Sequence, residues 1–214
     1  MIKYLFTAAM LLVYFPGNGQ AIPIPEGYEK LDEKEGDLTN DHTAEKVIVY
    51  NTSDSTELGK VREIQIYKKS VDKWDLLASS NNAIGKSEEG RMTGDPFDSI
   101  EIKDGVLLIK QSGGSNWVWS KTDKYRFQDG QFQLIGYTNY YGKACEYFET
   151  IDFNLLTGKI SYEKEYQDCD QGDQKIKKNE TETFYKKGIK IYLANRASNE
   201  IKIVTPKYKH EIYL

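Results

Sequence analysis

The most regular alternation of hydrophobic and polar residues lies in residues 117–141, WVWSKTDKYRFQDGQFQLIGYTNYY. Strand-like residues flank Asp129-Gly130, a dipeptide typical of a type I′ turn because both turn positions take a positive φ. Successive side chains of a strand point to opposite faces, so this turn also predicts the register of a hairpin. The pairs predicted on one face form an aromatic layer: Phe127 with Phe132, Tyr125 with Leu134, and Trp119 with Tyr140.

The same reasoning predicts a second hairpin over Ile100–Lys110, with its turn at Asp104-Gly105 and with Ile102 opposite Leu107 and Ile100 opposite Ile109. No stretch shows sustained helical periodicity. The sequence therefore predicts an all-β fold of about nine to eleven strands, a mostly antiparallel meander of hairpins that forms a closed barrel, a sandwich or a partial propeller-like arrangement. The other predicted strands are Lys46–Tyr50, Arg62–Lys68, Trp74–Ser79, Glu146–Phe153, Lys159–Tyr166, Thr181–Lys186 and Ile189–Leu193, with a last edge strand in Val204–Leu214.

Three polar segments between these runs are predicted to be loops. Glu33–Glu45 and Asp168–Gln174 are acidic and turn-rich. Asn81–Pro96 is rich in Gly, Ser and charged residues and is predicted to be a long surface loop. Long loops often carry function, so this segment is the first place to expect a functional excursion.

The first residues, Met1–Ala21, have the pattern of a signal peptide. Lys3 precedes the apolar run Tyr4–Phe15, and small residues stand at Gly19 and Ala21, before the expected cut. The run is too short to span a bilayer, and no later segment is apolar enough to do so. We therefore expect an exported protein, periplasmic or extracellular, with no membrane span after removal of the signal and with residues 22–214 forming a single β-rich domain.

Charge and cysteine content narrow the choice of partner and compartment. The formal net charge is −4, with both signs interleaved along the chain, which gives no reason to expect a nucleic-acid partner. Cys145 and Cys169 are the only two cysteines, and in an exported chain such a pair is expected to form a disulfide. The predicted strand register places Cys145 opposite Asp168, so a bulge or a frayed strand end is needed to bring Cys169 to it.

Residues 36–50, GDLTNDHTAEKVIVY, carry the most specific local pattern. This stretch resembles one unit of the FG-GAP/VCBS family, in which a calcium-type loop of the form G-D-x-N-x-D-G-x-x-D precedes an apolar strand. Residues 125–136 and 152–158 are more loosely similar to small exported bacterial proteins of unknown function that carry the same single unit. The resemblance implies calcium as a stabilising ion, bound by the side chains of Asp37, Thr39, Asp41 and Glu45 and by the carbonyl of Thr43. His42 stands where the family has a glycine, and the alternative is a loop of Asx turns without an ion.

Aromatic residues near the main hairpin offer a surface for recognition: Trp117, Trp119, Tyr137, Tyr140 and Tyr141. Exposed rings stack on apolar faces of glycans and peptides, whereas the alternative role of these rings is core packing. The expected function is non-catalytic recognition of a protein or a glycan. Two alternatives stay open: a periplasmic inhibitor or immunity-type protein, and a hydrolase with paired carboxylates such as Glu88/Glu89 or Asp95/Asp98.

Overall fold

The computed structural model describes residues 21–71, 73–170, 173–197 and 201–214, and in them the chain forms thirteen strands and two short 3-10 helices. The predicted signal peptide, Met1–Ala21, lies outside the described residues except for Ala21. The prediction of an all-β fold built from antiparallel hairpins is confirmed. Within the described residues the large sheet ends at strands that do not pair with each other, so it is an open sheet rather than a closed barrel.

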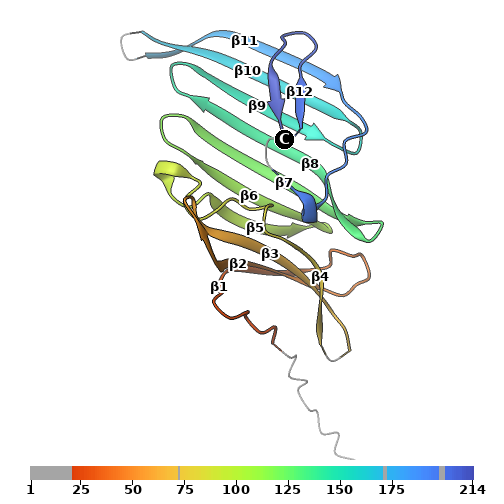
Figure 1. Cartoon of the computed structure of the whole chain (residues 1–214). Coiled ribbons are helices and arrows are strands. Elements are labelled where there is room, and N and C mark those ends of the chain that lie inside the picture. The colour runs from red at the N-terminus through yellow and green to blue at the C-terminus, as the bar shows by residue number, and fades with distance from the viewer. Residues whose placement is uncertain (1–20, 72, 171–172, 198–200) are drawn as a thin grey trace, which may run out of the picture.

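The strands form three sheets, in each of which neighbours in sequence are neighbours in space (Figure 1). The small sheet contains β1 (Glu29–Gly36), β2 (Glu45–Thr56), β3 (Gly59–Lys69) and β4 (Trp74–Ser80). The large sheet contains β5 (Phe97–Lys103), β6 (Val106–Gly114), β7 (Val118–Gln128), β8 (Gln131–Lys143), β9 (Tyr147–Asn154), β10 (Lys159–Asp170) and β11 (Asp173–Tyr185). The third sheet pairs β12 (Lys202–Val204) with β13 (Glu211–Tyr213), and the 3-10 helices are Arg91–Thr93 and Leu193–Asn195.

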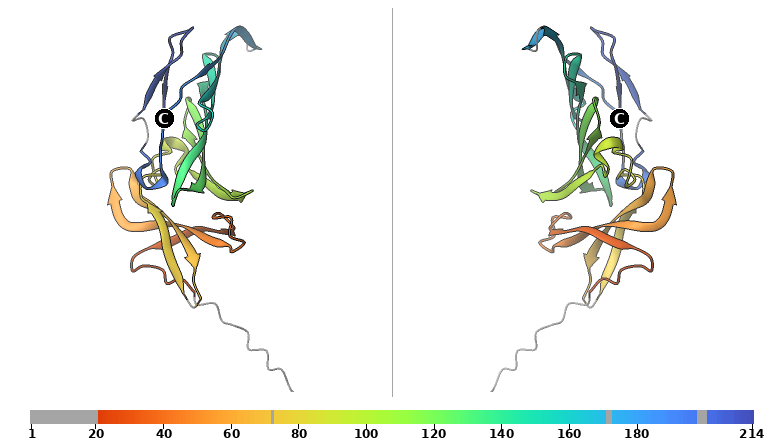
Figure 2. Two further views of the ribbon diagram at one scale, coloured as in Figure 1. Left: turned by 90° about the vertical axis from the view of Figure 1, so that its right-hand side faces the viewer. Right: turned by 90° about the vertical axis from the view of Figure 1, so that its left-hand side faces the viewer.

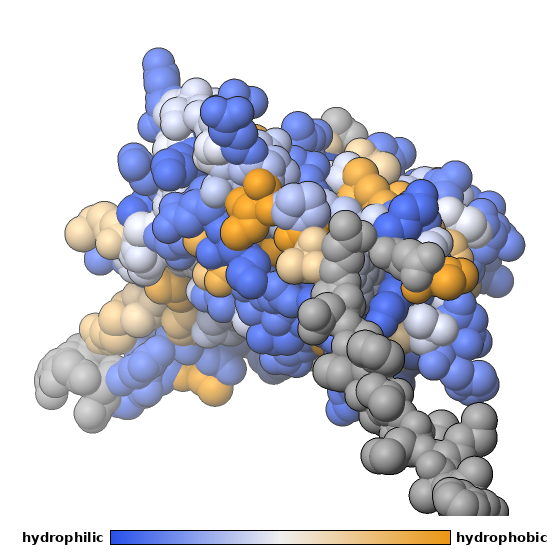
Figure 3. Space-filling view, turned by 90° about the horizontal axis from the view of Figure 1, so that it is seen from below, coloured by the Kyte–Doolittle hydropathy of each residue, from blue (hydrophilic) through white to orange (hydrophobic). Residues whose placement is uncertain are grey.

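One hydrophobic core joins the small sheet, the large sheet and the segment after β11. In the side views this C-terminal segment runs along one face of the large sheet, and the small sheet lies below (Figure 2). Seen from below, the molecule is mainly hydrophilic, with hydrophobic residues in small separate groups (Figure 3). The apolar side chains are therefore turned inward; those without exposure include Val47, Val49, Ile64, Ile66, Ile100, Leu107, Ile109 and Tyr125.

Two hairpin turns match their sequence signals. Asp104 and Gly105 have φ values of 51° and 71°, and Asp129 and Gly130 have φ values of 52° and 78°. Both central residues of each turn thus lie in the left-handed region, as a type I′ turn requires. The resulting pairs include Ile100 with Ile109, Ile102 with Leu107, Tyr125 with Leu134 and Phe127 with Phe132, all as predicted.

The predicted register of the β7–β8 hairpin is wrong beyond Leu134. Lys124 pairs with Gly136, so Ile135 is an extra residue in β8 and forms a bulge. An inserted residue shifts the pairing by one position and turns the following side chains to the other face. Trp119 therefore pairs with Tyr141 instead of Tyr140.

The segment Asn81–Pro96 is not the purely exposed loop that its composition predicted. Ala83 and Ile84 are buried in the core. The side-chain amide of Gln111, on β6, accepts a hydrogen bond from the Gly85 N–H at 2.7 Å and donates one to the Ala83 carbonyl at 3.1 Å. This segment thus connects the small sheet to the large sheet and is fixed at the edge of the site described below.

Other local predictions are wrong in their bounds. Strand β1 extends into the predicted loop Glu33–Glu45 as far as Gly36, and β10 and β11 continue through most of Asp168–Gln174. Ile189–Leu193 makes one isolated bridge, to Gln133, in place of a strand. The tail forms β12 and β13, which pair with each other instead of extending the large sheet. No helix among the described residues is long and apolar enough to cross a bilayer.

Candidate functional site

Two adjoining pockets lie where the C-terminal segment crosses the large sheet. The larger pocket has a volume of about 710 Å³ and the smaller about 450 Å³. They share three residues of β8, namely Tyr137, Asn139 and Tyr141. These three alternate along the strand, so their side chains point to the same face of the sheet and form a wall common to both pockets.

The larger pocket owes its aromatic surface to β7 and β8. Trp119 pairs with Tyr141 and Lys121 pairs with Asn139, and all four side chains line this pocket. The bulge at Ile135 is what brings Tyr141 to this face, since an unbroken register would have placed Tyr140 here.

A glycine sets the position of the Trp119 indole. Gly113, on β6, pairs with Trp119. A Cβ added to Gly113 would lie 2.8 Å from the Cζ2 atom of Trp119, which is closer than van der Waals contact. The indole therefore lies directly over the backbone of β6, and a side chain at position 113 would have to push it away.

The structure brings together four of the five aromatic residues that the sequence singled out. Trp117 stacks on Tyr141, with ring centres 5.3 Å apart and planes at 12°, and supports it from outside the larger pocket. Tyr137 is almost completely buried, and burial raises its pKa to about 12, so it combines a core role with a place in the wall. Tyr140 is on the opposite face, 37% exposed and stacked on Phe148 at 5.2 Å.

A buried ion pair lies at the base of the larger pocket. The Nε atom of Arg196 donates to the Oδ2 atom of Asp123 at 2.9 Å, and the two side chains are 3% and 1% exposed. The Tyr125 hydroxyl donates to the same oxygen at 3.2 Å. Since Asp123 is on β7 and Arg196 follows the second 3-10 helix, this pair fixes the C-terminal segment to the sheet. The sequence reasoning missed it; the one available signal was a charged residue, Asp123, at an inward position of an aromatic strand.

Lys121 places a positive charge inside the larger pocket. Its Nζ atom lies 5.9 Å from the centre of the Trp119 ring. Burial lowers its pKa from the ordinary value of 10.5, although the nearby Asp123 carboxylate acts in the opposite direction. Desolvation disfavours the charged form of a lysine, whereas an anion beside it would favour that form.

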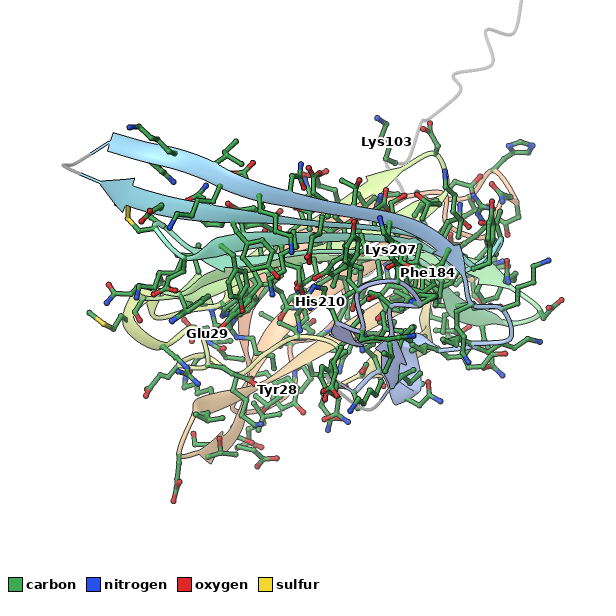
Figure 4. The ribbon with its side chains drawn as sticks, turned by 90° about the horizontal axis from the view of Figure 1, so that it is seen from above. Tyr28, Glu29, Lys103, Phe184, Lys207 and His210 are labelled. Carbon is green, nitrogen blue, oxygen red and sulfur yellow. A yellow bond between two sulfur atoms is a disulfide. The ribbon has the colours of Figure 1, made fainter. Side chains whose placement is uncertain are left out.

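The smaller pocket combines aromatic rings with charges of both signs. The Lys164 ammonium lies 3.7 Å from the centre of the Tyr147 ring, and the Tyr162 hydroxyl donates to Glu149 at 2.7 Å. His210 lines the same pocket from the turn between β12 and β13. The ring is labelled beside the large sheet in Figure 4.

His210 also holds the β12–β13 pair against β11. Its Nε2 atom lies 2.7 Å from the Oε2 atom of Glu180, and the Lys178 ammonium contacts the other oxygen. These two partners, Lys178 first, lower the pKa of Glu180 from 4.5 to about 2. The carboxylate thus stays charged over the ordinary pH range and keeps this wall of the smaller pocket in place.

The loop with the calcium-type sequence connects β1 to β2, and its carboxylates accept hydrogen bonds from the loop itself. Both oxygens of Glu45 accept bonds, from the N–H groups of Leu38 and Thr39 and from the Thr39 hydroxyl, at 2.8 to 3.1 Å. Asp37 accepts bonds from the N–H groups of Asp41 and His42. His42 has a φ of 66°, so it does adopt the left-handed conformation that the family's glycine would take.

The remaining predicted ligands face other partners. One oxygen of Asp41 accepts the Thr43 N–H and the other contacts the Lys68 ammonium at 2.5 Å. Within the described residues, no group of three or more His, Cys, Asp or Glu side chains is placed to hold a metal ion. In this arrangement the donor set does not fit calcium, because the oxygens point at N–H donors rather than at one centre. Calcium binding by this loop stays a prediction.

The calcium prediction implies that millimolar calcium raises the melting temperature of the wild type relative to chelator, and that Asp37→Ala shows no such rise. Differential scanning fluorimetry of the wild type and of Asp37→Ala would measure this. A ligand that binds only the folded state raises the melting temperature by mass action. Identical melting temperatures of the wild type in chelator and in millimolar calcium would leave this segment as a loop of Asx turns without an ion.

The predicted disulfide is present: the sulfur atoms of Cys145 and Cys169 are bonded, and their Cα atoms lie 5.1 Å apart. Cys145 stands in the turn between β8 and β9 with a φ of 68°, so it does not occupy a strand position opposite β10. The pairing of β9 with β10 ends at Tyr147 and Tyr166, before either cysteine. The mismatch of one residue is thus resolved at the β8–β9 turn that carries Cys145; the fraying expected at the acidic loop is not seen, because Cys169 still pairs with Gln174.

In comparisons with known proteins, no family model, no curated protein and no solved structure matches this chain. The resemblance of residues 36–50 to one FG-GAP/VCBS unit therefore stays a prediction.

Proposed function

We propose that this protein is an exported carbohydrate-binding domain whose ligand occupies the two adjoining pockets. The observation that supports this most directly is the row of alternating side chains on β7 and β8: Trp119 and Tyr141 present rings, and Asn139 presents an amide between the pockets. Sugar rings have apolar C–H faces that pack on aromatic rings, and their hydroxyl groups exchange hydrogen bonds with amides and charged groups. Concave sites with a few placed polar groups are typical of small-ligand binding.

Several features support a rigid site of this kind. Trp119 is seated over Gly113, and Tyr141 is stacked on Trp117, so both rings are held in place before any ligand arrives. A preformed site loses less conformational entropy on binding than a flexible one. The Cys145–Cys169 disulfide is compatible with an oxidising compartment and therefore with export.

A second candidate function, an inhibitor of another protein, is favoured by the β10–β11 hairpin. Residues Gln167–Asp170 pair with β11 but extend past the end of β9. The hairpin projects from the edge of the molecule in Figure 1, and the disulfide ties it to the β8–β9 turn. A projecting and cross-linked hairpin is a suitable element for insertion into a partner's cleft. We place it second because the aromatic residues gather in the pockets instead.

The proposal predicts that binding of an oligosaccharide depends on Trp119 and Tyr141 and not on Tyr140. Titration calorimetry with soluble oligosaccharides of glucose, galactose, mannose and N-acetylglucosamine would identify a ligand. Replacement of an aromatic residue that stacks on the ligand by Ala is expected to weaken binding by about tenfold or more, whereas an uninvolved residue has little effect.

Tyr140→Ala is the matched control, because it removes the same side chain one residue along β8 on the opposite face. The melting temperature of each variant would show that it is folded. Binding that persists in Trp119→Ala and Tyr141→Ala but is lost in Tyr140→Ala would rule out the pockets as the site.

A further inference from the structure

We propose that the ligand is a long, linear glycan, because a row of tyrosine rings, Tyr141, Tyr147 and Tyr166, leads from the wall shared by the two pockets to a further subsite on β9 and β10. This inference rests on the proposed function and adds the length and shape of the ligand. It implies that one part of the glycan fills the pockets while the rest lies along this tyrosine row.

The tyrosine row lies on the same face of the large sheet as the pockets. Tyr141 is on β8, Tyr147 is on β9 and Tyr166 is on β10. Tyr147 pairs with Lys143 of β8 on one side and with Tyr166 on the other. Directly paired residues point to the same face, and Lys143 follows Tyr141 by two positions along β8. All three rings therefore share the face that carries the pockets.

The rings follow one another at a nearly constant step. The ring centres of Tyr141 and Tyr147 are 6.3 Å apart, with planes at 57°, and those of Tyr147 and Tyr166 are 6.2 Å apart, with planes at 55°. The three side chains are half-buried, so part of each ring is open to solvent. The same distance and tilt are thus repeated from one strand to the next. A ligand made of identical units can form the same contact at each step, whereas a single sugar cannot reach all three rings.

The tyrosine row extends beyond the pockets. Tyr141 lines both pockets and Tyr147 lines the smaller one, but Tyr166 is part of neither lining and lies one strand further on. From Trp119 on β7 to Tyr166 on β10 the path crosses three strand spacings, or about 14 Å. Each pocket is also within the range of about 300 to 1,000 Å³ that holds a drug-sized ligand. One sugar unit would therefore leave most of this surface uncovered.

Polar groups accompany the tyrosine row and are held in fixed positions. The Lys164 ammonium lies 3.7 Å from the centre of the Tyr147 ring and 5.4 Å from that of Tyr166. Glu149 lies 3.8 Å from the same ammonium and accepts the Tyr162 hydroxyl at 2.7 Å. An ammonium has three N–H donors and a carboxylate has about four acceptor sites, so this ion pair keeps capacity for the hydroxyl groups of an uncharged sugar. Since Lys164 covers one face of Tyr147, we expect the glycan to meet this ring at its edge and its hydroxyl group.

The test compares short and long probes on the exported protein. Titration calorimetry would use disaccharides and hexasaccharides derived from cellulose, mannan, galactan and chitin. We expect the hexasaccharide of the sugar that binds to have an affinity about tenfold or more above that of its disaccharide, since the longer probe alone reaches the tyrosine row. Tyr166→Ala is expected to weaken binding of the hexasaccharide by about twofold to tenfold, the usual value of one hydrogen bond, and to leave binding of the disaccharide unchanged.

Tyr185→Ala is the matched control, because Tyr185 is 66% exposed on the opposite face of the sheet and lines neither pocket. It should bind both probes as the wild type does. A folding defect would weaken binding of both probes, so a loss confined to the hexasaccharide identifies Tyr166 as part of a subsite. Tyr166→Leu keeps an apolar side chain at this position and replaces the Ala variant if that variant does not fold.

Two results would overturn the long-glycan inference and leave the carbohydrate proposal standing. One is equal affinity of the wild type for the disaccharide and the hexasaccharide. The other is an unchanged dependence on probe length in the folded Tyr166 variant. If no probe of either length binds, the proposed function fails as well.

Discussion

Replacement of Arg196 by Met is expected to lower the free energy of unfolding by about 3 to 5 kcal/mol. Arg196 and Asp123 are both almost fully buried, and the Tyr125 hydroxyl also donates to the Asp123 side chain. Removal of the guanidinium leaves a carboxylate in a desolvated position without its ion partner. Urea unfolding of the wild type and of Arg196→Met, followed by tryptophan fluorescence, would measure the difference.

The double variant Asp123→Leu/Arg196→Met serves as the control. A buried ion pair replaced as a whole by apolar side chains of similar size is often nearly neutral for stability. We therefore expect the double variant to recover most of the stability that the single variant loses. If Arg196→Met alone is as stable as the wild type, the pair does not fix the C-terminal segment in the way that the geometry indicates.

Replacement of Cys145 and Cys169 by Ser is expected to lower the free energy of unfolding by about 3 kcal/mol, because the bond closes a loop of about 25 residues in the unfolded chain. Both cysteines are exposed, so no cavity forms when the sulfur atoms are replaced, and the loss should come from the unfolded state. Guanidinium unfolding of the oxidised protein and of the double variant would give the two values.

Reduction of the wild type provides the matching control. An exposed disulfide is accessible to a small thiol, so wild-type protein in reductant should unfold at the same denaturant concentration as Cys145→Ser/Cys169→Ser. Free-thiol titration would confirm the redox state of each sample. Identical unfolding curves for the oxidised and reduced wild type would show that the bond contributes nothing to stability.

The hairpins with two-residue Asp-Gly turns could be predicted from sequence to the level of individual pairs. The turn at Asp129-Gly130 fixes its flanking residues because only one register satisfies the two positive φ values and the alternation of apolar side chains. The predicted pairing is wrong from Ile135 onward, because this extra residue in β8 shifts the register by one position. An apolar residue at a bulge cannot be distinguished by its sequence from any other strand residue. No local sequence pattern therefore predicts that the side chains after Ile135 change to the other face of the sheet.

The site could be predicted in part for the same reason. Trp119, Tyr137 and Tyr141 come together because they lie on two strands joined by a turn that the sequence predicts, and Trp117 directly precedes the first of these strands. Asp123 and Arg196 could not be matched in this way, since they are separated by 73 positions and Arg196 follows a short 3-10 helix instead of lying on a strand. Contacts of that kind depend on where the chain returns to the sheet, which a pattern of local periodicity does not contain.

The order of the elements along the chain has a consequence for how the protein matures. The strands that carry Trp119 and Tyr141 are synthesised before the segment with Arg196, His210 and Leu214, which closes the pockets. During synthesis, the strands that carry these aromatic residues are therefore complete while the segment that covers them is still missing. A chain stopped before Arg196 would present these residues uncovered, and exposed apolar surface on an incomplete chain promotes aggregation and recognition by chaperones and proteases. The segment from Arg196 onward thus distinguishes a complete chain from a truncated one, since only a chain that contains this segment covers its aromatic residues.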